Sequence, residues 1–232
     1  MPNNSEIFEK RYKQNREQGK NGWSTEESYS NAAKNIDRIL SAGYVKNIGK
    51  VLELGCGAGN NLIYLAKKGF EVYGIDHSEE AISWAKEKTG KENVKAGLSV
   101  GDAALLKDFK DSFFDFVFDG GVSYYVCGKA RKTFFDNINR VLKPGGFCYI
   151  AAQHSDEKPK VEITKGSFRW SPKEGTFYRD GKEWASYRLS KEIIEEVTSA
   201  RFKIVNIKKG KDEHPEDPFA CGGELAIDCI KN

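Results

Sequence analysis

The sequence has no apolar run that approaches the roughly 20 residues that a helix needs to cross a bilayer. Its N-terminal stretch, residues 1–20, is polar and lacks the apolar segment of a secretory signal. These two absences exclude a membrane protein and argue against export. A strong charge of one sign is also missing, because 37 basic residues face 34 acidic residues and leave a net charge of +3. Charge alone therefore does not indicate a nucleic-acid-binding protein.

Histidine and paired cysteine are scarce as well. The five cysteines form no Cys-x-x-Cys pair and lie at positions 56, 127, 148, 221 and 229. An odd, scattered set of this kind indicates free thiols in a reducing compartment, so we expect a cytoplasmic protein. The three histidines, His77, His154 and His214, lie far apart in the sequence and show no metal-ligand spacing. We therefore expect no metal site.

What is present is a regular alternation of strands and helices in a chain of 232 residues, a length typical of one domain with a small appendage. The apolar patterns predict strands at 50–54, 70–75, 98–101, 114–119, 147–152, 202–207 and 224–230. They predict helices at 31–41, 60–68, 79–89, 130–142 and 191–200. Strands that alternate with helices through short turns predict an α/β fold with a doubly wound, mostly parallel sheet. The last two strands are most simply antiparallel.

A different pattern interrupts this alternation between residues 153 and 187, which are rich in aromatic side chains and lack a clear helix. Asp180-Gly181 within this stretch is a strong signal for a two-residue β-turn, so we expect a small β-hairpin insert that could act as a lid. The domain organisation predicted for the chain is an N-terminal helical cap (1–45), a cofactor-binding core (46–152), an aromatic insert (153–188) and a C-terminal helix with an antiparallel strand pair (189–232).

The most informative segment is the glycine-rich Val51–Asn60, which joins the first predicted strand to a helix. Glycines there let a ligand approach the backbone, although a tight turn alone would also explain them. Asp76 ends the next strand, where a carboxylate can accept hydrogen bonds from both hydroxyls of a ribose. Asp102 follows the third strand and could accept from the amino group of a purine, or cap the next helix. The pattern predicts a nucleoside cofactor, either a dinucleotide or S-adenosylmethionine.

Glu53 separates these two cofactors. It lies inside the first strand, two residues before the first glycine, where it would repel a pyrophosphate but not a cofactor that carries sulfonium and ammonium groups. The glycine spacing also departs from Gly-x-Gly-x-x-Gly, because Asn60 stands where the third glycine would be. Both features argue against a nicotinamide oxidoreductase.

Taken in order, the segments ELGCGAGN, YGID, VGDA, FDFVFDGG and VLKPGG resemble the successive motifs of class I S-adenosylmethionine-dependent methyltransferases. The resemblance implies a Rossmann-like, seven-stranded fold, with S-adenosyl-L-methionine as cofactor and S-adenosyl-L-homocysteine as product. It implies that the glycine loop approaches the methionine part, that Asp76 holds the ribose, and that Asp102 reads the adenine edge. The cofactor-binding residues that it implies are Glu53, Gly55, Cys56, Gly57, Asp76, His77, Asp102, Ala103, Asp119 and Gly120.

One motif departs from many members of that family. Where these carry an Asn-Pro-Pro-Tyr type sequence after the fourth strand, this chain has Asp119-Gly120-Gly121-Val122. The departure argues against an enzyme that methylates amino groups of DNA or glutamine side chains of proteins.

The acceptor is expected over the carboxyl ends of the fourth and fifth strands. His154, directly after the fifth strand, is the predicted general base, although a loop histidine bonded to backbone is an alternative. Asp119 is the second residue predicted to be catalytic. The predicted substrate-binding residues could instead pack the insert onto the sheet, and they are Tyr12, Trp23, Tyr124, Tyr125, His154, Trp170 and Tyr178.

The leading functional hypothesis is a transferase that methylates an N or O atom of a small molecule by in-line displacement. The alternatives are an RNA or protein methyltransferase and a non-catalytic protein that binds S-adenosylmethionine. An RNA or protein substrate would need a basic face, for which residues 10–20 are the only candidate segment. We therefore expect a small-molecule acceptor as partner, and neither a membrane nor a nucleic acid.

Overall fold

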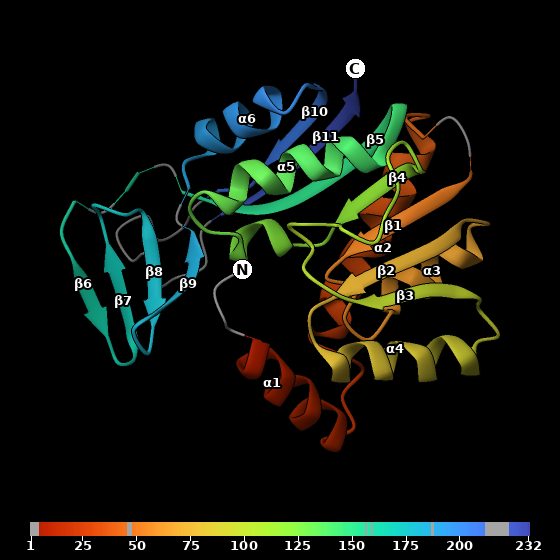
Figure 1. Ribbon diagram of the computed structural model, residues 1–232, viewed down its shortest axis with the longest axis horizontal. Helices are drawn as coiled ribbons and strands as arrows, with labels where there is room; N and C mark the ends of the chain where they lie inside the picture. The colour runs from red at the N-terminus through yellow and green to blue at the C-terminus, as the bar shows by residue number, and fades with distance from the viewer. Residues whose placement is uncertain (1–4, 46–47, 156, 159, 187, 212–222) are drawn as a thin grey trace.

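The computed structural model describes residues 5–45, 48–155, 157–158, 160–186, 188–211 and 223–232, so His214 and Cys221 lie outside the described residues. Seven strands form one sheet in the order β10-β11-β5-β4-β1-β2-β3 (Figure 1). β11 runs antiparallel to both neighbours and the other pairs are parallel. The strands are β1 (Lys50–Leu54), β2 (Glu71–Asp76), β3 (Ala96–Val100), β4 (Phe114–Asp119), β5 (Leu142–His154), β10 (Phe202–Lys209) and β11 (Gly223–Lys231). The predicted doubly wound α/β sheet is confirmed.

Helices cover both faces of this sheet. One face packs against α2 (Glu26–Ser41), α3 (Asn60–Lys67) and α4 (Glu79–Lys91), which bury the apolar side chains of Ile36, Leu62 and Ile82. The other face packs against α5 (Ala130–Val141) and α6 (Ser190–Ser199), which bury Phe134 and Val197. Side chains in a strand alternate between the two faces, so Leu52 joins the α5 side while its neighbour Glu53 points to α3, where Asn61 meets it. An acid is thereby placed inside the first strand.

The N-terminal segment contains α1 (Ser5–Glu17), a helix that buries Phe8, Tyr12 and Asn15. These positions recur at intervals of four and three, which places them on one side of the helix. α2 begins at Glu26, five residues earlier than the pattern of apolar residues predicts. The reason is a cap, because the side chain of Thr25 accepts a hydrogen bond from the backbone N–H of Ser28 at 3.2 Å.

The insert is larger than the predicted hairpin. Four antiparallel strands form a second sheet, β6 (Ile163–Lys165), β7 (Phe168–Ser171), β8 (Thr176–Arg179) and β9 (Lys182–Ser186). The hairpin itself is confirmed, since Asp180 and Gly181 have φ of 50° and 77° and Arg179 pairs with Lys182 across the turn. β6 and β7 extend the hairpin into a sheet large enough to bury Trp170. Figure 1 shows this sheet to one side of the main sheet, with α1 between it and α4 in that view.

Two boundaries differ from the sequence pattern for local reasons. The strand predicted at 147–152 begins earlier, at Leu142, and its pairing with β4 shifts register between Phe114 and Phe116. α6 has Leu189 rather than Ser190 at its N-cap, because the side chain of Glu192 accepts the hydrogen bond from the backbone N–H of Leu189 at 2.9 Å.

Two further properties concern only the residues that the structure describes. Within these ranges, no helix is both long and apolar enough to cross a membrane. No group of three or more His, Cys, Asp or Glu side chains in the same ranges could hold a metal ion. The four cysteines that are described, Cys56, Cys127, Cys148 and Cys229, are buried thiols without a disulfide bond.

Candidate functional site

The glycine loop after β1 has a backbone that side chains would obstruct. Gly55 and Gly57 have φ of 63° and 52°, in the left-handed region that favours glycine. A Cβ at Gly57 would lie 2.8 Å from the hydroxyl of Tyr12, and a Cβ at Gly55 would collide with Val122. The backbone N–H of Cys56 donates to the carbonyl oxygen of Ile75 at 3.1 Å, which fixes the loop against the end of β2. The loop is therefore a narrow cradle between β1, α1 and the segment that follows β4.

Asp76 fastens this loop to the start of α4. Its carboxylate accepts hydrogen bonds from the backbone N–H of Gly57 and of Ser78, each at 3.0 Å. Burial is the main cause that raises the pKa of Asp76, and the two backbone N–H groups act against it. Ser78 caps α4 as the sequence predicts, because its hydroxyl accepts from the backbone N–H of Ala81 at 3.0 Å. The carboxylate of Asp76 thus lies at the meeting point of β2, the glycine loop and a helix N-terminus.

Glu53 is the second buried acid of this region. One carboxylate oxygen accepts from the side-chain amide of Asn61 at 2.8 Å, while the other oxygen, Oε2, has no hydrogen-bond partner among the described residues. Burial, with the nearby charge of Asp76 as a smaller cause, raises the pKa of Glu53 to about 8. The same burial, again with Asp76 as a smaller cause, raises the pKa of the buried Tyr12 hydroxyl.

This region fits a cofactor that carries positive charge. Within the part of the chain that the structure describes, neither Glu53 nor Asp76 forms an ion pair. A buried carboxylate without a cation is costly, and an ammonium or sulfonium group beside Glu53 would supply the missing partner. A pyrophosphate would add to the repulsion instead. The orphaned Oε2 atom and the glycine cradle are therefore consistent with S-adenosylmethionine.

The predicted adenine side is less open. The carboxylate of Asp102 accepts from the backbone N–H of Ala104 at 2.8 Å, and it is half-buried. Ala103 beside it is buried. The ring of His77 lies edge-on to Phe8 with centroids 4.8 Å apart, and its Nε2 atom is buried without a hydrogen-bond partner among the described residues.

Asp119, at the end of β4, caps the short 3-10 helix η1 (Val122–Tyr125). Its side chain accepts from the backbone N–H groups of Gly121 at 3.0 Å, Val122 at 2.7 Å and Ser123 at 3.4 Å. Burial raises the pKa of Asp119 to about 6, and these hydrogen bonds limit the shift. Gly120 is exposed beside it. Asp119 therefore fixes the backbone of η1, whatever else it contacts.

Arg131 of α5 holds η1 from the other side. Its guanidinium donates to the carbonyl oxygens of Ser123 at 2.6 Å and Val126 at 3.0 Å, and it pairs with Glu196 of α6. Ser186 of β9 also donates to the carbonyl oxygen of Val126, at 2.8 Å. The segment after β4 is therefore bonded to α5, α6 and the insert at once.

Aromatic rings from four separate parts of the chain meet above this segment. Of the predicted substrate-binding residues, the structure brings Tyr124 to 5.1 Å from Tyr125, and Tyr12 to 5.3 Å from Trp23, between ring centroids. Phe8, at 5.2 Å from both Trp23 and Tyr125, links these two pairs. Two members of this group were not predicted as site residues, Phe8 and Trp184. The four-residue spacing of Phe8 and Tyr12 was the signal for the first.

Three predicted residues make other contacts. Trp170 is fully buried in the insert, 5.2 Å from Phe177, in a cluster against which Tyr124, Tyr125 and Trp184 pack. Tyr178 follows Phe177 in β8 and donates its hydroxyl to Glu174 at 2.8 Å. The Nε2 atom of His154 bonds to the carbonyl oxygen of Gly210 at 3.1 Å, toward β10 and away from β4.

α1 is attached to the start of α4 by polar contacts that the sequence does not reveal. Glu9 accepts from the hydroxyl of Ser78 at 2.6 Å and from the backbone N–H of Glu80 at 3.0 Å, where a helix dipole favours negative charge. Arg16 forms ion pairs with Glu80 and Glu87. These contacts hold Tyr12 over the glycine loop.

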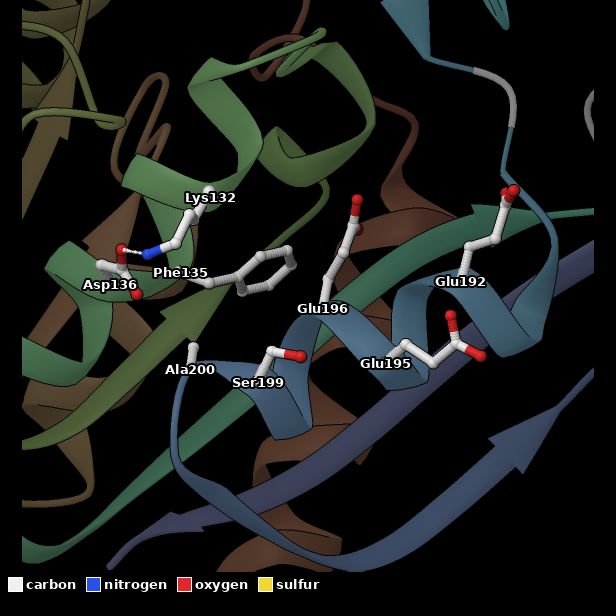
Figure 2. Close-up of a pocket in the computed structure, with 8 residues that line it drawn as sticks. All are labelled: Lys132, Phe135, Asp136, Glu192, Glu195, Glu196, Ser199 and Ala200. Atoms are coloured by element: carbon white, nitrogen blue, oxygen red, sulfur yellow. Dashed lines mark hydrogen bonds and ion pairs between the residues drawn. The ribbon is translucent and has the colours of Figure 1, made fainter.

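A groove between α5 and α6 is the cavity shown in Figure 2, with a volume of about 420 Å³. It contains none of the predicted site residues, and its sides are mostly charged. Its lining residues are Lys132, Phe135, Asp136, Glu192, Glu195, Glu196, Ser199 and Ala200. Glu196 and Phe135 link it to the site, because both contact Arg131.

Comparisons with known proteins agree with this geometry. A family described as a methyltransferase domain matches residues 52–150. An uncharacterized methyltransferase of Schizosaccharomyces pombe is 30% identical over 121 residues, which is 52% of this chain and 83% of that protein.

Solved structures show the same fold. An S-adenosylmethionine-dependent methyltransferase from Clostridium acetobutylicum is 15% identical with a TM-score of 0.65, over 90% of this chain and 93% of that one. The 1,6-didemethyltoxoflavin-N1-methyltransferase of Burkholderia thailandensis is 18% identical with a TM-score of 0.70, over 98% of this chain and 87% of that one.

The chain belongs to the class I S-adenosylmethionine-dependent methyltransferases. It is an enzyme of that class, and its cofactor is S-adenosyl-L-methionine.

Proposed function

We propose that this methyltransferase acts on a small-molecule acceptor at an N or O atom. The observation that carries the proposal is the aromatic group above η1, in which Tyr125 meets Phe8 of α1 and Trp184 of the insert. Rings from α1 and the insert close over the carboxyl ends of the strands, a cover that suits a compact molecule rather than a polymer. The Burkholderia structure named above contains 1,6-didemethyltoxoflavin, a small molecule, which supports the same substrate class.

The basic residues of α1 argue against the alternative of an RNA or protein substrate. Arg16 is already paired with Glu80 and Glu87, and Arg11 lies over the ring of Trp23 at 4.1 Å. Lys20 donates to the side chain of Asn15 at 3.2 Å. Arg16 and Arg11 are thus engaged within the protein, although Arg11 and the three lysines of residues 10–20 are exposed, so fewer cations are free to contact a phosphate backbone.

When bound, S-adenosylmethionine supplies a methyl group on a cationic sulfur. An acceptor atom held beside it would take that methyl group by in-line displacement, and the sulfur would keep the electron pair of the broken bond. In our proposal, Glu53 faces the positive charge of the cofactor and Asp76 accepts from the ribose hydroxyls. Asp119 and Arg131 hold η1 in place, so Tyr124 and Tyr125 can orient the acceptor. Alignment of this kind can lower a barrier by roughly 7–11 kcal/mol.

An acceptor that arrives protonated also needs a base, and we propose His154 for this role. Its Nε2 atom bonds to a carbonyl oxygen, which only accepts, so Nε2 carries the hydrogen and the neutral ring has its lone pair on Nδ1. With the acceptor known, His154→Ala is expected to lower turnover about 100-fold. The affinity for S-adenosylhomocysteine should stay unchanged. Normal turnover of the variant would leave His154 a structural residue.

We also propose that the four predicted segments work as one domain. The N-terminal cap (1–45) and the insert (153–188) would then supply the acceptor site, while residues 46–152 bind the cofactor. The ion pair between Arg38 of α2 and Asp228 of β11 supports this, because it joins the cap to the C-terminal strands.

The test is a search for the acceptor with cofactor that carries a labelled methyl group. The purified protein is incubated with metabolite extracts, and separately with total RNA and total protein. Label that appears in a low-molecular-weight product supports the proposal. Label that enters only RNA or protein would overturn it. A protein that binds S-adenosylhomocysteine by calorimetry yet labels nothing in any pool would favour the non-catalytic alternative.

A further inference from the structure

The ring of Phe8 occupies a slot bounded by aromatic rings. Trp184 lies parallel to it, with an angle of 8° between the planes and 5.3 Å between the centroids. Tyr125 and His77 present their edges, at angles of 89° and 83° and distances of 5.2 Å and 4.8 Å. One parallel face and two perpendicular edges are the arrangement that holds a flat ring most favourably.

Three of the rings around Phe8 belong to the main body of the enzyme, whereas Phe8 belongs to α1 and the fourth ring, Trp23 at 5.2 Å, lies in the same N-terminal segment. His77 follows Asp76 at the end of β2, Tyr125 lies in η1 after β4, and Trp184 comes from β9 of the insert. The slot therefore lies between the ends of two strands that carry site residues. The three wall residues are only half-buried, so the slot reaches the surface once Phe8 is withdrawn.

The slot also contains a polar atom that Phe8 leaves unsatisfied. The Nε2 atom of His77 is buried and has no hydrogen-bond partner among the described residues. A hydrocarbon ring cannot supply a partner, but a hydroxyl or a ring nitrogen on a flat molecule can.

We propose that this slot is the acceptor site and that Phe8 holds the place of the acceptor's ring. The acceptor is then a small planar aromatic or heteroaromatic compound with a hydroxyl or ring nitrogen that pairs with His77. This inference rests on the proposed function, since it specifies the acceptor class of the same site. It requires α1, which is fastened to α4 by Glu9 and Arg16, to withdraw Phe8 when the acceptor enters.

The direction in which one substitution changes probe affinity shows whether Phe8 occupies the acceptor's position or forms a wall of the site. If Phe8 occupies the acceptor's position, Phe8→Ala opens the slot and an aromatic probe binds more tightly. If Phe8 is a wall of the site, the same change removes a contact and the probe binds more weakly. The probe is 2-naphthol, compared with 2-decalol, which has the same carbon skeleton without aromatic faces. Binding is measured by titration calorimetry on protein saturated with S-adenosylhomocysteine.

We expect 2-naphthol to bind Phe8→Ala about tenfold more tightly than it binds the parent protein. Both proteins should bind 2-naphthol at least tenfold more tightly than 2-decalol. Trp184→Leu should weaken binding about tenfold. Phe168→Leu, in the same insert but outside the slot, is the matched control and should leave it unchanged. Circular dichroism and thermal unfolding confirm that each variant is folded. Because His77 pairs with the hydroxyl, 2-naphthol should also bind more tightly than naphthalene.

Weaker binding of 2-naphthol to Phe8→Ala, or equal binding of 2-naphthol and 2-decalol, would overturn the inference. Competition between 2-naphthol and S-adenosylhomocysteine would also overturn it, because the slot would then belong to the adenosine. Failure of the proposed function has a different signature: a protein that does not bind S-adenosylhomocysteine, or that labels only RNA or protein, fails before any probe is added.

Discussion

The two halves of the site treat their charged groups in opposite ways. In the cofactor half, Glu53 and Asp76 are buried acids without a cation among the described residues, and one oxygen of Glu53 has no partner there. In the acceptor half, Asp119 accepts from three backbone N–H groups, and Arg131 is bonded to two carbonyl oxygens and to Glu196. Both halves are buried, yet only the first contains a carboxylate oxygen without a hydrogen-bond partner among the described residues.

The difference indicates what each half contributes. A cation beside the unpartnered oxygen of Glu53 would stabilise its ionised form, so that half gains binding energy from charge. The acceptor half has its charged groups hydrogen-bonded or paired within the protein and presents aromatic rings. The charged residues of the acceptor half hold the backbone of η1 in place. The aromatic rings, through their faces and edges, are the groups that would contact a ligand.

The largest expected effect tests the cofactor half. Asp76→Ala removes the acid that we assign to the ribose, and each charge-assisted hydrogen bond is worth roughly 1.5–3 kcal/mol. Because two such bonds would be lost, affinity for S-adenosylhomocysteine should fall about 100-fold or more, as measured by calorimetry. Asp108→Ala, an exposed acid in the loop after β3, is the control and should change affinity less than twofold. An unchanged dissociation constant in Asp76→Ala would show that the carboxylate serves only the backbone of the glycine loop.

The next prediction tests the acceptor half. Arg131→Met should lower the free energy of unfolding by about 2–4 kcal/mol, because it leaves two carbonyl oxygens and Glu196 without their partner. This corresponds to a fall in melting temperature of roughly 5–15 °C. Affinity for S-adenosylhomocysteine should change less than about twofold. Lys132→Met, next in the chain and 84% exposed, should change stability by less than about 0.5 kcal/mol. A large loss of cofactor affinity in Arg131→Met would mean that cofactor binding depends on the structure of the acceptor half.

The pH dependence follows from the acid in β1. Glu53 has a pKa raised from its ordinary value of 4.5 to about 8, so the folded protein holds a proton that the unfolded chain has lost between these pH values. The stability that Glu53 contributes is therefore present in full below pH 4.5 and is lost as pH rises toward 8. A bound cation favours the ionised form, so cofactor binding at pH 7 should release close to one proton.

Calorimetry of S-adenosylhomocysteine binding in buffers of different ionisation enthalpy measures this release. Affinity should rise up to about tenfold per pH unit below pH 8 and level off above it. Glu53→Gln should abolish both effects, and it should be more stable than the parent protein above pH 8. The titratable groups that face Glu53 are the carboxyl group of Asp76, the thiol of Cys56 and the two phenols of Tyr12 and Tyr29. Equal binding enthalpies in all buffers would show that Glu53 is already ionised in the unliganded protein.

The smallest effect concerns the joint between the insert and η1. Ser186→Ala removes one buried hydrogen bond, to the carbonyl oxygen of Val126, and should lower the free energy of unfolding by about 1 kcal/mol. Urea unfolding measures the change, and Thr198→Ala, which removes an exposed intrahelical hydrogen bond, is the control. If hydrogen exchange of residues 122–127 is unaltered in Ser186→Ala, the insert does not help to hold η1.

The main sheet was predictable because its determinants are local. Most strands of the core are short apolar segments, and helices follow β1, β2, β4 and β5 or the segments joined to them, with a clear cap such as Ser78 for α4. The motifs of the cofactor half are also continuous in sequence, so Glu53, Asp76 and the glycines were found directly. α1 escaped prediction because it buries only three of its 13 residues and has little apolar pattern.

The acceptor half could be predicted only in part, since its contacts join residues far apart in the chain. Phe8 and Trp184 meet across 176 positions, and Arg131 and Glu196 across 65. Composition marked the insert as aromatic but could not say which rings face the site. Trp170 and Trp184 look alike in the sequence, yet strand alternation and pairing bury the first inside the insert and turn the second toward α1.

The position of β11 has a consequence for how the chain acquires its structure. β10 is an edge strand that joins the sheet only through β11, although β11 follows it in the chain. During synthesis β10 therefore leaves the ribosome before β11, the strand with which it pairs. One edge of β5 also stays unpaired until β11 is made. We expect the two last strands to pair with each other first and then to dock on β5 as a preformed hairpin, so that sheet closure is a late event in folding.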